Sequence, residues 1–517
     1  MIRKIRHNYI IYMCVCVALL PLIVLRDYTP SNELRYLSIA DDALRNHTFF
    51  TFYNHGEVYA DKPPLYFWAL MLCRWLAGGY HMWMLALFSL LPAVGVVAVM
   101  DRWVAGEADL SHRRLAALML FTSGLFLGTS FILRMDMLMT LFIVLALREF
   151  WRMYCDEGGR RSRWLFPVYL FLALFAKGPF GLLIPFCATT VFLLLSRQTA
   201  RFARFWGWRT WAVLGALCVC WFIGVYAEGG RGYLDNLLVH QTVGRAVNSF
   251  HHKRAFYYYL VHVWYCIAPW SLLAACTLVV SQRKTFVKSS LLCFFQTVAI
   301  VTFVLLSCVS AKLQVYLLPA IPFFVYPVAL LLPRLGHPWW LRLSVAVPAV
   351  AFAAVLPLLP MVATWEEVQA WGGMWVYGAA AAFTLTGVVA LWLLSGGKDV
   401  ERAIRCMCAG LLLAVFAAGW AMPRLNSRLG YAELCGEAKA MSRVCGVADI
   451  RTWDLPRTEG MDVYLGVPVK VLPSDVVPSA DKGHPYILVT RRSNLPKLGG
   501  LRRGTVVGEY AVVPFLK

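Results

Sequence analysis

Long apolar segments recur from about residue 9 to residue 422, and they restrict the fold of this chain more than any other feature. Hydrophobic residues make up 60% of the sequence and charged residues only 15%. An apolar segment inside a bilayer must pair its own backbone N–H and C=O groups, so it folds as a helix. The pattern therefore predicts an all-α polytopic membrane protein.

The apolar segments predict about thirteen transmembrane helices. Their ranges are 9–25, 82–103, 115–133, 137–153, 165–176, 180–195, 211–227, 258–280, 291–309, 315–332, 341–362, 375–394 and 403–422. The first segment could be a signal peptide, but no small-residue cleavage site precedes Arg26, so we expect an uncleaved span. The run 65–77 is shorter than the ~20 residues that a span needs and is predicted to lie along the membrane surface.

The net charge of +21 is distributed as membrane topology requires, and not as nucleic-acid binding would require. With the N-terminus in the cytoplasm, all inner loops are basic, whereas the outer connection 364–373 contains neither Lys nor Arg. The basic inner loops are 102–114, 160–163, 197–209, 283–288, 334–342 and 398–405. Because Lys and Arg favour the cytoplasmic side, this pattern predicts a cytoplasmic N-terminus and an outer C-terminus.

Apolar density falls near residue 425, which predicts two domains. Residues 1–424 would form the membrane domain, with a first outer loop at 26–81 that carries juxtamembrane helices. Residues 425–517 would form a small outer α/β domain, with a helix at 431–444 and strands at 448–453, 463–472, 486–490 and 506–513. The fifteen cysteines show no metal-ligand spacing, and Cys435 and Cys445 could pair if this domain lies in an oxidising compartment.

Ionisable side chains concentrate in the first outer loop and at the predicted outer ends of later spans. The loop contains Asp27, Glu33, Arg35, Tyr36, Asp61 and Lys62; the later positions are Asp136, Lys177, His251, His252, Arg254, Lys312 and Tyr316. Taken singly, Lys177 and Lys312 could extend to the headgroups, and Asp136 could pair with Arg134. The first loop could equally be an ordinary hydrated loop. Gathered on one face, these groups predict a functional site.

Cations and carboxylates at a membrane surface suit one kind of chemistry. Lys and Arg bind phosphate by charge-assisted hydrogen bonds, and a carboxylate can take a proton from an acceptor or orient it. The sequence has no phosphate-binding or dinucleotide-binding glycine motif. Since ATP and nucleotide sugars are cytosolic, an outer-face phosphate would be lipid-linked. The residues therefore predict group transfer from a polyprenyl phosphate to an outer-face acceptor.

Six segments, in order, resemble one family of membrane glycosyltransferases. They are SNELRYLSIA (31–40), YADKPPLYFW (59–68), RMDMLMTLF (134–142), AKGPFGLLIP (176–185), HHKRAFYYY (251–259) and SAKLQVYLLP (310–319). Over roughly residues 1–425 the chain resembles GT-C enzymes, in the branch of protein O-mannosyltransferases and lipid A aminoarabinose (ArnT-like) transferases, families 39 and 83. The resemblance implies a bacterial inner-membrane enzyme with an undecaprenyl-phosphate-sugar donor and lipid A, or another envelope glycolipid, as acceptor.

The resemblance also assigns roles to individual residues. Lys62 and Tyr316 would hold the donor phosphate, assisted by Arg254 and Lys312. Asp136 would match the family's second acid. Asp61, with His251 or His252, would match positions that bind zinc in the aminoarabinose branch; the residues themselves imply no required cofactor.

One position departs from the family pattern. The first acid of the family, which acts on the acceptor, is replaced by Asn32. An amide cannot serve as a general base. Glu33 or Asp27 would then take that role, with Glu33 preferred; otherwise an amine acceptor needs only orientation, or the chain is catalytically impaired.

Three other functions compete with transfer to a glycolipid. A protein Ser or Thr could be the acceptor in the same mechanism. A transporter would show paired repeats with broken helices and charges along a path, which this sequence lacks. A non-catalytic membrane scaffold is compatible with Asn32.

Overall fold

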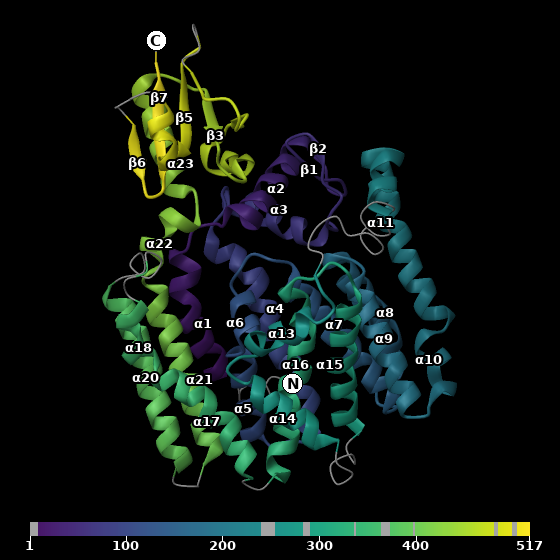
Figure 1. Cartoon of the computed structure of the whole chain (residues 1–517). Helices are drawn as coiled ribbons and strands as arrows, with labels where there is room; N and C mark the ends of the chain where they lie inside the picture. The colour runs from purple at the N-terminus through teal and green to yellow at the C-terminus, as the bar shows by residue number, and fades with distance from the viewer. Residues whose placement is uncertain are drawn as a thin grey trace.

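The computed structural model describes residues 9–238, 254–282, 290–335, 338–362, 365, 373–395, 399–479, 484–498 and 504–516. Figure 1 shows a bundle of helices with a small α/β unit at one end, and the first outer loop lies at that same end. The predicted combination of an all-α membrane domain and a C-terminal α/β domain is confirmed.

Each predicted span contains a described helix or helix pair. They are α1 (Tyr9–Leu25), α4 (Met82–Trp103), α5 (Leu110–Phe121) with α6 (Gly124–Thr129), α7 (Asp136–Tyr154), α8 (Gly159–Lys177), α9 (Phe180–Leu195), α11 (Trp208–Asp235), α13 (Tyr258–Cys266) with α14 (Ser271–Ser281), α15 (Ser290–Cys308), η6 (Gln314–Ala320) with α16 (Ile321–Leu331), α17 (Trp339–Ala353) with α18 (Val355–Val362), α20 (Met374–Ser395) and α21 (Val400–Gly419). By length and hydropathy alone, six helices in the described ranges could cross a membrane, or up to nine if each bent pair is one span. The count of thirteen therefore stays a prediction.

Two of the predicted spans differ from the structure in shape. The range 258–280 is not one straight helix: α13 and α14 are bent by 114° across a short break that contains Pro269. The predicted span 165–176 is too short, because the first residues of this helix are polar and do not resemble a membrane span. The helix α8 begins at Gly159 and runs for 19 residues, so Arg160, Arg161 and Arg163 lie within its first turns.

Ion pairs join the loops that the sequence places on the inner side. Asp156, after α7, pairs with Arg201 at 3.1 Å and also with Arg204 of α10 (Phe202–Trp206). Arg113 of α5 donates to the Asp101 carboxylate of α4 at 3.0 Å. The Asp156 contacts join the loops 160–163 and 197–209, and the Arg113–Asp101 pair closes the connection 102–114; these loops lie at one end of the bundle (Figure 1).

The C-terminal domain packs α23 (Ala432–Cys445) against a mixed sheet. The strand order is β4 (Lys470–Leu472), β3 (Ile450–Trp453), β5 (Tyr486–Arg491), β7 (Tyr510–Phe515) and β6 (Thr505–Val507). The strand β3 is parallel to β4 and β5, and β7 is antiparallel to β5 and β6.

Two strand predictions in this domain were wrong. The range 506–513 is a hairpin of β6 and β7, because Gly508 turns the chain with a φ of +57°. The range 463–472 begins as a helical turn, α24 (Asp462–Leu465), and only its end is the strand β4. The pairing of Cys435 with Cys445 does not form, since both thiols are free. They lie ten residues apart on α23, about 15 Å along the axis, which exceeds the ~7 Å limit for a disulfide.

The first outer loop is folded and docks on the C-terminal domain. It contains η2 (Pro30–Leu34), α2 (Arg35–Asn46), β1 (Tyr53–Asn54), β2 (Glu57–Val58) and α3 (Leu65–Ala77), which matches the predicted juxtamembrane helix at 65–77. The Ser38 hydroxyl donates to the Asp462 carboxylate at 2.9 Å. From the bundle, Glu228 of α11 accepts the backbone N–H groups of Phe49, Phe50 and Thr51 at 2.7–3.1 Å. The loop is thus held from two sides.

Candidate functional site

A buried ion pair fixes the start of the first outer loop. Both Glu33 oxygens accept from the Arg26 guanidinium at 2.7 Å. Glu33 also accepts from the Thr29 N–H at 2.8 Å, the Thr29 hydroxyl at 3.0 Å and the Leu133 N–H at 2.9 Å. A carboxylate offers about four lone-pair sites, so these five donors occupy it fully. The side chain is 0% exposed, and it links the end of α1 to the chain that leads into α7.

Asp136 is at the centre of a second buried cluster. It is the first residue of α7, it contacts the Lys177 ammonium, and it accepts from Arg134 Nε at 3.0 Å. Lys177, at the end of α8, lies over the Tyr316 ring with its Nζ 4.4 Å from the centroid. Helices α7 and α8 and the turn η6 thus bring three of the predicted residues together, and the Asp136–Arg134 pair is also present.

The place of Lys177 depends on the glycine that follows it. Gly178 has φ 119° and ψ −158°, a region that only glycine enters without strain. Its N–H donates to the Leu174 carbonyl at 2.7 Å, which closes α8. The chain then turns directly into α9, so Lys177 stays at the end of the bundle where Tyr316 lies.

Asp61 and Lys62 form a third, more accessible pair between β2 and α3. Lys62 Nζ lies 2.8 Å from the Asp61 carboxylate, and the two side chains are 17% and 18% exposed. The Tyr59 hydroxyl donates to Asp61 at 3.3 Å. The Arg35 guanidinium covers the Tyr36 and Tyr59 rings, 5.7 Å from each centroid. Burial and the nearby Asp61 charge raise the pKa of Tyr59, so its hydroxyl remains a donor.

Asn32 lies beside this group. It is half-buried in η2, and its side-chain oxygen accepts from the Arg35 guanidinium at 3.3 Å. The Arg35 Nε atom is buried without a hydrogen-bond partner, and no carboxylate among the described residues pairs with Arg35.

Lys312 presents a buried charge with neutral partners only. Its ammonium donates to the backbone carbonyls of Arg254, at 3.3 Å, and of Val309, and it donates to no carboxylate within the described residues. Lys312 is only 3% exposed. Arg254 is exposed, and its N–H donates to the Ser310 carbonyl at 3.3 Å. A buried ammonium is costly unless an anion balances it, so this position fits an anionic ligand.

The clusters adjoin one another. Lys62 is close enough to Lys177 for the two ammonium groups to interact electrostatically. The buried Tyr66 hydroxyl interacts electrostatically with Glu33 and Asp136, and it has no hydrogen-bond partner among the described residues. Residues as far apart in the sequence as Glu33 and Tyr316 therefore converge at the end of the bundle that carries the first outer loop.

Asp27 is placed elsewhere, at the junction of the two domains. Its carboxylate accepts from the Tyr28 N–H at 2.7 Å, from the Ala432 N–H at 2.9 Å and from the Tyr464 hydroxyl. Its own N–H donates to the Asn426 side chain at 3.0 Å. Burial raises the pKa of Asp27 above its ordinary value. These contacts describe a structural link to the C-terminal domain.

The predicted zinc ligands are only partly described. His251 and His252 lie outside the described residues, and Asp61 is paired with Lys62. Across the ranges that the structure describes, no group of three His, Cys, Asp or Glu side chains could hold a metal ion. Of the three predicted zinc ligands, the described residues therefore include only Asp61.

Four contributors were absent from the sequence-based site. Arg26 appeared there only as the boundary of the first span, and Arg134 only as a partner of Asp136. Tyr59 and Tyr66 lie within the YADKPPLYFW segment, where aromatic residues are expected to be core. Their spacing around Asp61 and Lys62 was the one available indication.

No protein-family profile matches the chain. It is 24% identical over 467 residues to the undecaprenyl phosphate-alpha-4-amino-4-deoxy-L-arabinose arabinosyl transferase 1 of Pseudomonas fluorescens (strain Pf0-1), covering 83% of this chain and 77% of the relative. It is also 24% identical over 469 residues to the enzyme of the same type from Edwardsiella ictaluri (strain 93-146), covering 84% and 81%.

Two crystal structures of one such enzyme have the same fold as this chain. The crystal structure of ArnT from Cupriavidus metallidurans bound to undecaprenyl phosphate superposes with a TM-score of 0.80, at 19% identity, over 98% of both chains. The apo form of that protein gives a TM-score of 0.78 at 18% identity. The chain therefore has the fold of the ArnT crystal structures, and over most of its length its sequence is similar to curated aminoarabinose transferases.

Proposed function

We propose that this protein transfers aminoarabinose from undecaprenyl phosphate to lipid A at the periplasmic face of the bacterial inner membrane. The relatives that carry this activity in their names support the donor, and the ArnT crystal with undecaprenyl phosphate supports the carrier. The observation that carries the proposal is the positive charge at one end of the bundle: each described carboxylate of the site has its own cation, and none of the described carboxylates pairs with Lys312, Arg254 or Arg35.

The orientation belongs to the same proposal. The site and the C-terminal domain lie at one end of the bundle, and the ion-paired basic loops lie at the other (Figure 1). Because basic loops stay in the cytoplasm, the site would face the periplasm. That is the compartment in which a lipid-linked donor is required, since nucleotide sugars are confined to the cytosol.

In the proposed reaction, the bond between the sugar C1 and a carrier-phosphate oxygen breaks, and C1 bonds to an acceptor oxygen. The phosphate leaves with the electron pair as undecaprenyl phosphate. Lys312, Arg254 and Lys62 would offset the charge that develops on it, and the Tyr316 hydroxyl would donate to it. Lys177 is held by Asp136 against the Tyr316 ring, so we assign Asp136 and Lys177 to positioning.

The base that takes the proton of the acceptor must be accessible to the acceptor. Glu33 is 0% and Asp136 is 1% exposed, whereas Asp61, which is paired with Lys62, is 18% exposed. We therefore assign proton acceptance, or orientation of the acceptor, to Asp61. Asn32 would orient the acceptor through its amide. Glu33, proposed from the sequence as the base, takes a positioning role in this scheme.

The proposed reaction does not depend on zinc, but a zinc site is proposed in addition to it. With His251 or His252, Asp61 could hold a zinc ion instead of accepting a proton, and the ion would supply positive charge beside the phosphate. No step is assigned to it. Elemental analysis of the purified protein tests this directly: stoichiometric zinc in the wild type and its loss in Asp61→Asn support the site, and wild-type protein free of zinc at full activity refutes it.

The function is tested with purified protein in nanodiscs, undecaprenyl-phosphate aminoarabinose and lipid A, with mass spectrometry of the lipid A. We expect one added aminoarabinose per acceptor site. Lys312→Met and Lys62→Met should lose most of the transfer, whereas Lys439→Met, on the C-terminal domain, should not. Donor that stays intact with every acceptor would refute a glycosyltransferase, and sugar found on added envelope protein instead of lipid A would refute the acceptor.

A further inference from the structure

A second basic site lies at the opposite end of the bundle, far from the candidate active site. A cavity of about 280 Å³ opens where the end of α7, the start of α8, α10 and the start of α11 meet. Arg163, Arg204 and Arg209 line it, with Met153, Phe205 and Trp208. The proposed reaction uses none of these residues.

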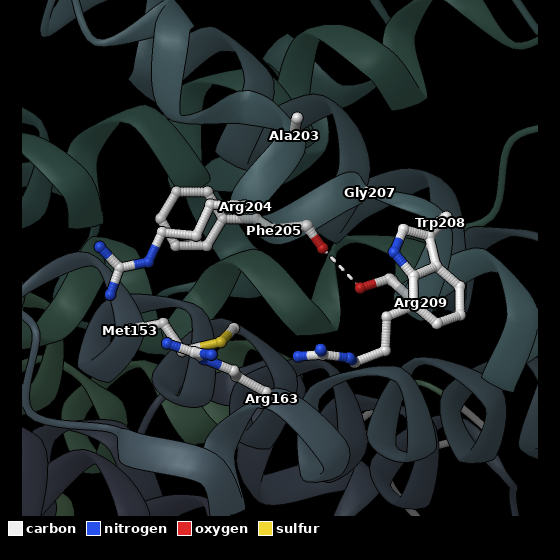
Figure 2. Close-up of a pocket in the computed structure, with 9 residues that line it drawn as sticks. Met153, Arg163, Ala203, Arg204, Phe205, Gly207, Trp208 and Arg209 are labelled. Carbon is white, nitrogen blue, oxygen red and sulfur yellow. Dashed lines mark hydrogen bonds between the residues drawn. The ribbon is translucent and has the colours of Figure 1, made fainter.

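The positive charge of this cavity is only partly balanced. Arg204 pairs with Asp156. Figure 2 shows the guanidinium ends of Arg163 and Arg209 turned toward each other below the α10–α11 turn, while that of Arg204 points away. Among the described residues neither Arg163 nor Arg209 has a carboxylate partner; Arg209 contacts the Trp208 ring at 5.9 Å. Two guanidinium groups that share a cavity favour an anion between them.

The cavity wall is rigid at the turn that separates the two arginine-bearing helices. The Thr210 hydroxyl donates to the Phe205 carbonyl at 2.6 Å, as Figure 2 shows, and Trp211 Nε1 donates to the Trp206 carbonyl at 2.9 Å. Gly207 passes so close to Ala203 that a Cβ atom there would lie 2.2 Å from the Ala203 carbonyl oxygen. The turn therefore fixes Arg209 relative to α10.

Exposed tryptophans place the cavity at the level of lipid headgroups. Trp164, Trp208 and Trp211 are 48%, 79% and 45% exposed, and they flank the cavity on α8 and α11. Tryptophan gathers at the membrane–water interface, where its ring is apolar and its N–H is hydrated. A phosphate-bearing group at this depth, beside open apolar surface, is the headgroup of a phospholipid.

We propose that this cavity binds the phosphate of an anionic phospholipid from the leaflet opposite the active site, with Arg163 and Arg209 as its ligands. Basic pockets between membrane helices commonly hold such headgroups. A free phosphate ion would satisfy the same two cations, but it would make no use of the adjoining apolar surface. Binding a lipid here would tie α8, which carries Lys177 at its other end, to the start of α11.

The test is native mass spectrometry of the delipidated full-length protein titrated with dioleoylphosphatidylglycerol. We expect the double variant Arg163→Gln/Arg209→Gln to bind this lipid about tenfold or more weakly than the wild type. The matched control, Arg160→Gln/Arg161→Gln, removes the same charge from exposed positions of α8 outside the cavity and should bind as the wild type does.

Two further arms distinguish the sources of the phosphate. Dioleoylphosphatidylcholine should bind much more weakly than phosphatidylglycerol, and 10 mM inorganic phosphate should not displace the lipid. Displacement by inorganic phosphate would refute a lipid site in favour of a phosphate-ion site. Equal losses in the two double variants would refute the cavity, because they would show that only general surface charge attracts the lipid.

Discussion

Replacing Glu33 by Gln removes the negative charge of the buried pair with Arg26 but keeps the shape of the side chain. Arg26 is then a guanidinium that is 6% exposed, without its counter-ion. The Leu133 and Thr29 donors would compete for a single carbonyl oxygen, because the amide nitrogen of Gln cannot accept. The change therefore tests whether Glu33 holds the site together or takes a proton.

The size of the effect follows from the burial of both partners. Breaking a fully buried ion pair by removing one member costs about 3–5 kcal/mol, chiefly because a charge stays buried alone. That is a large part of a typical stability of about 5–15 kcal/mol. The double variant Arg26→Met/Glu33→Gln removes the stranded charge as well. It should regain about 2 kcal/mol relative to Glu33→Gln, since the two sites are directly coupled.

The assay measures thermal unfolding and turnover on the same detergent-purified samples. For a positioning residue, Glu33→Gln lowers the unfolding temperature clearly, and the double variant recovers part of both stability and activity. A general base behaves differently: its loss costs about 10²–10⁴-fold in turnover with the fold intact. Unchanged unfolding temperature with turnover lost, and no rescue by Arg26→Met, would refute our assignment and restore Glu33 as the base.

Three more outcomes are expected from the described contacts. Lys312→Met should raise the KM for the donor about tenfold, with Lys439→Met unchanged, because a charged hydrogen bond is worth about 1.5–3 kcal/mol; equal KM values would remove Lys312 from the phosphate site. Gly178→Ala should destabilise the protein by about 1–3 kcal/mol, read by thermal unfolding, because φ 119° is strained for any side chain. Burial raises the pKa of Asp462, so its contribution to stability is present in acid and is lost as the pH rises through that pKa. In a His55→Gln background, the unfolding temperature should fall from acidic to neutral pH more steeply than in the same protein with Asp462→Asn, and parallel profiles would contradict this.

The sequence was sufficient for the helices because hydrocarbon leaves a long apolar segment no alternative to intra-segment hydrogen bonding. It was insufficient where two short helices share one apolar run. Pro269 marks a place where a helix can break, but the 114° angle between α13 and α14 depends on packing that no local pattern records. The strand error at 506–513 had a local cause, since Gly508 was readable as a turn.

The sequence could predict that the polar residues lie close together, but it could not predict the role of each residue. Positive-inside counting placed Asp136, Lys177 and Tyr316 on one face, and the structure brings them into contact. The sequence could not show that Arg26, seven residues before Glu33, occupies both of its oxygens. A carboxylate in a motif looks equally available in every sequence, whereas its availability depends on how many donors the fold directs at it.

The donors directed at position 32 also explain how Asn32 can replace an acid. Arg35 donates to the Asn32 oxygen at 3.3 Å, which an aspartate would also accept, so the contact survives without the charge. The net charge of the site does change. With Asn32, Arg35 has no carboxylate partner among the described residues, so the site carries one more positive charge next to Lys62 and Tyr59. In the proposed reaction this exchange increases the attraction for the phosphate leaving group, and the base that is lost at position 32 is assigned to Asp61.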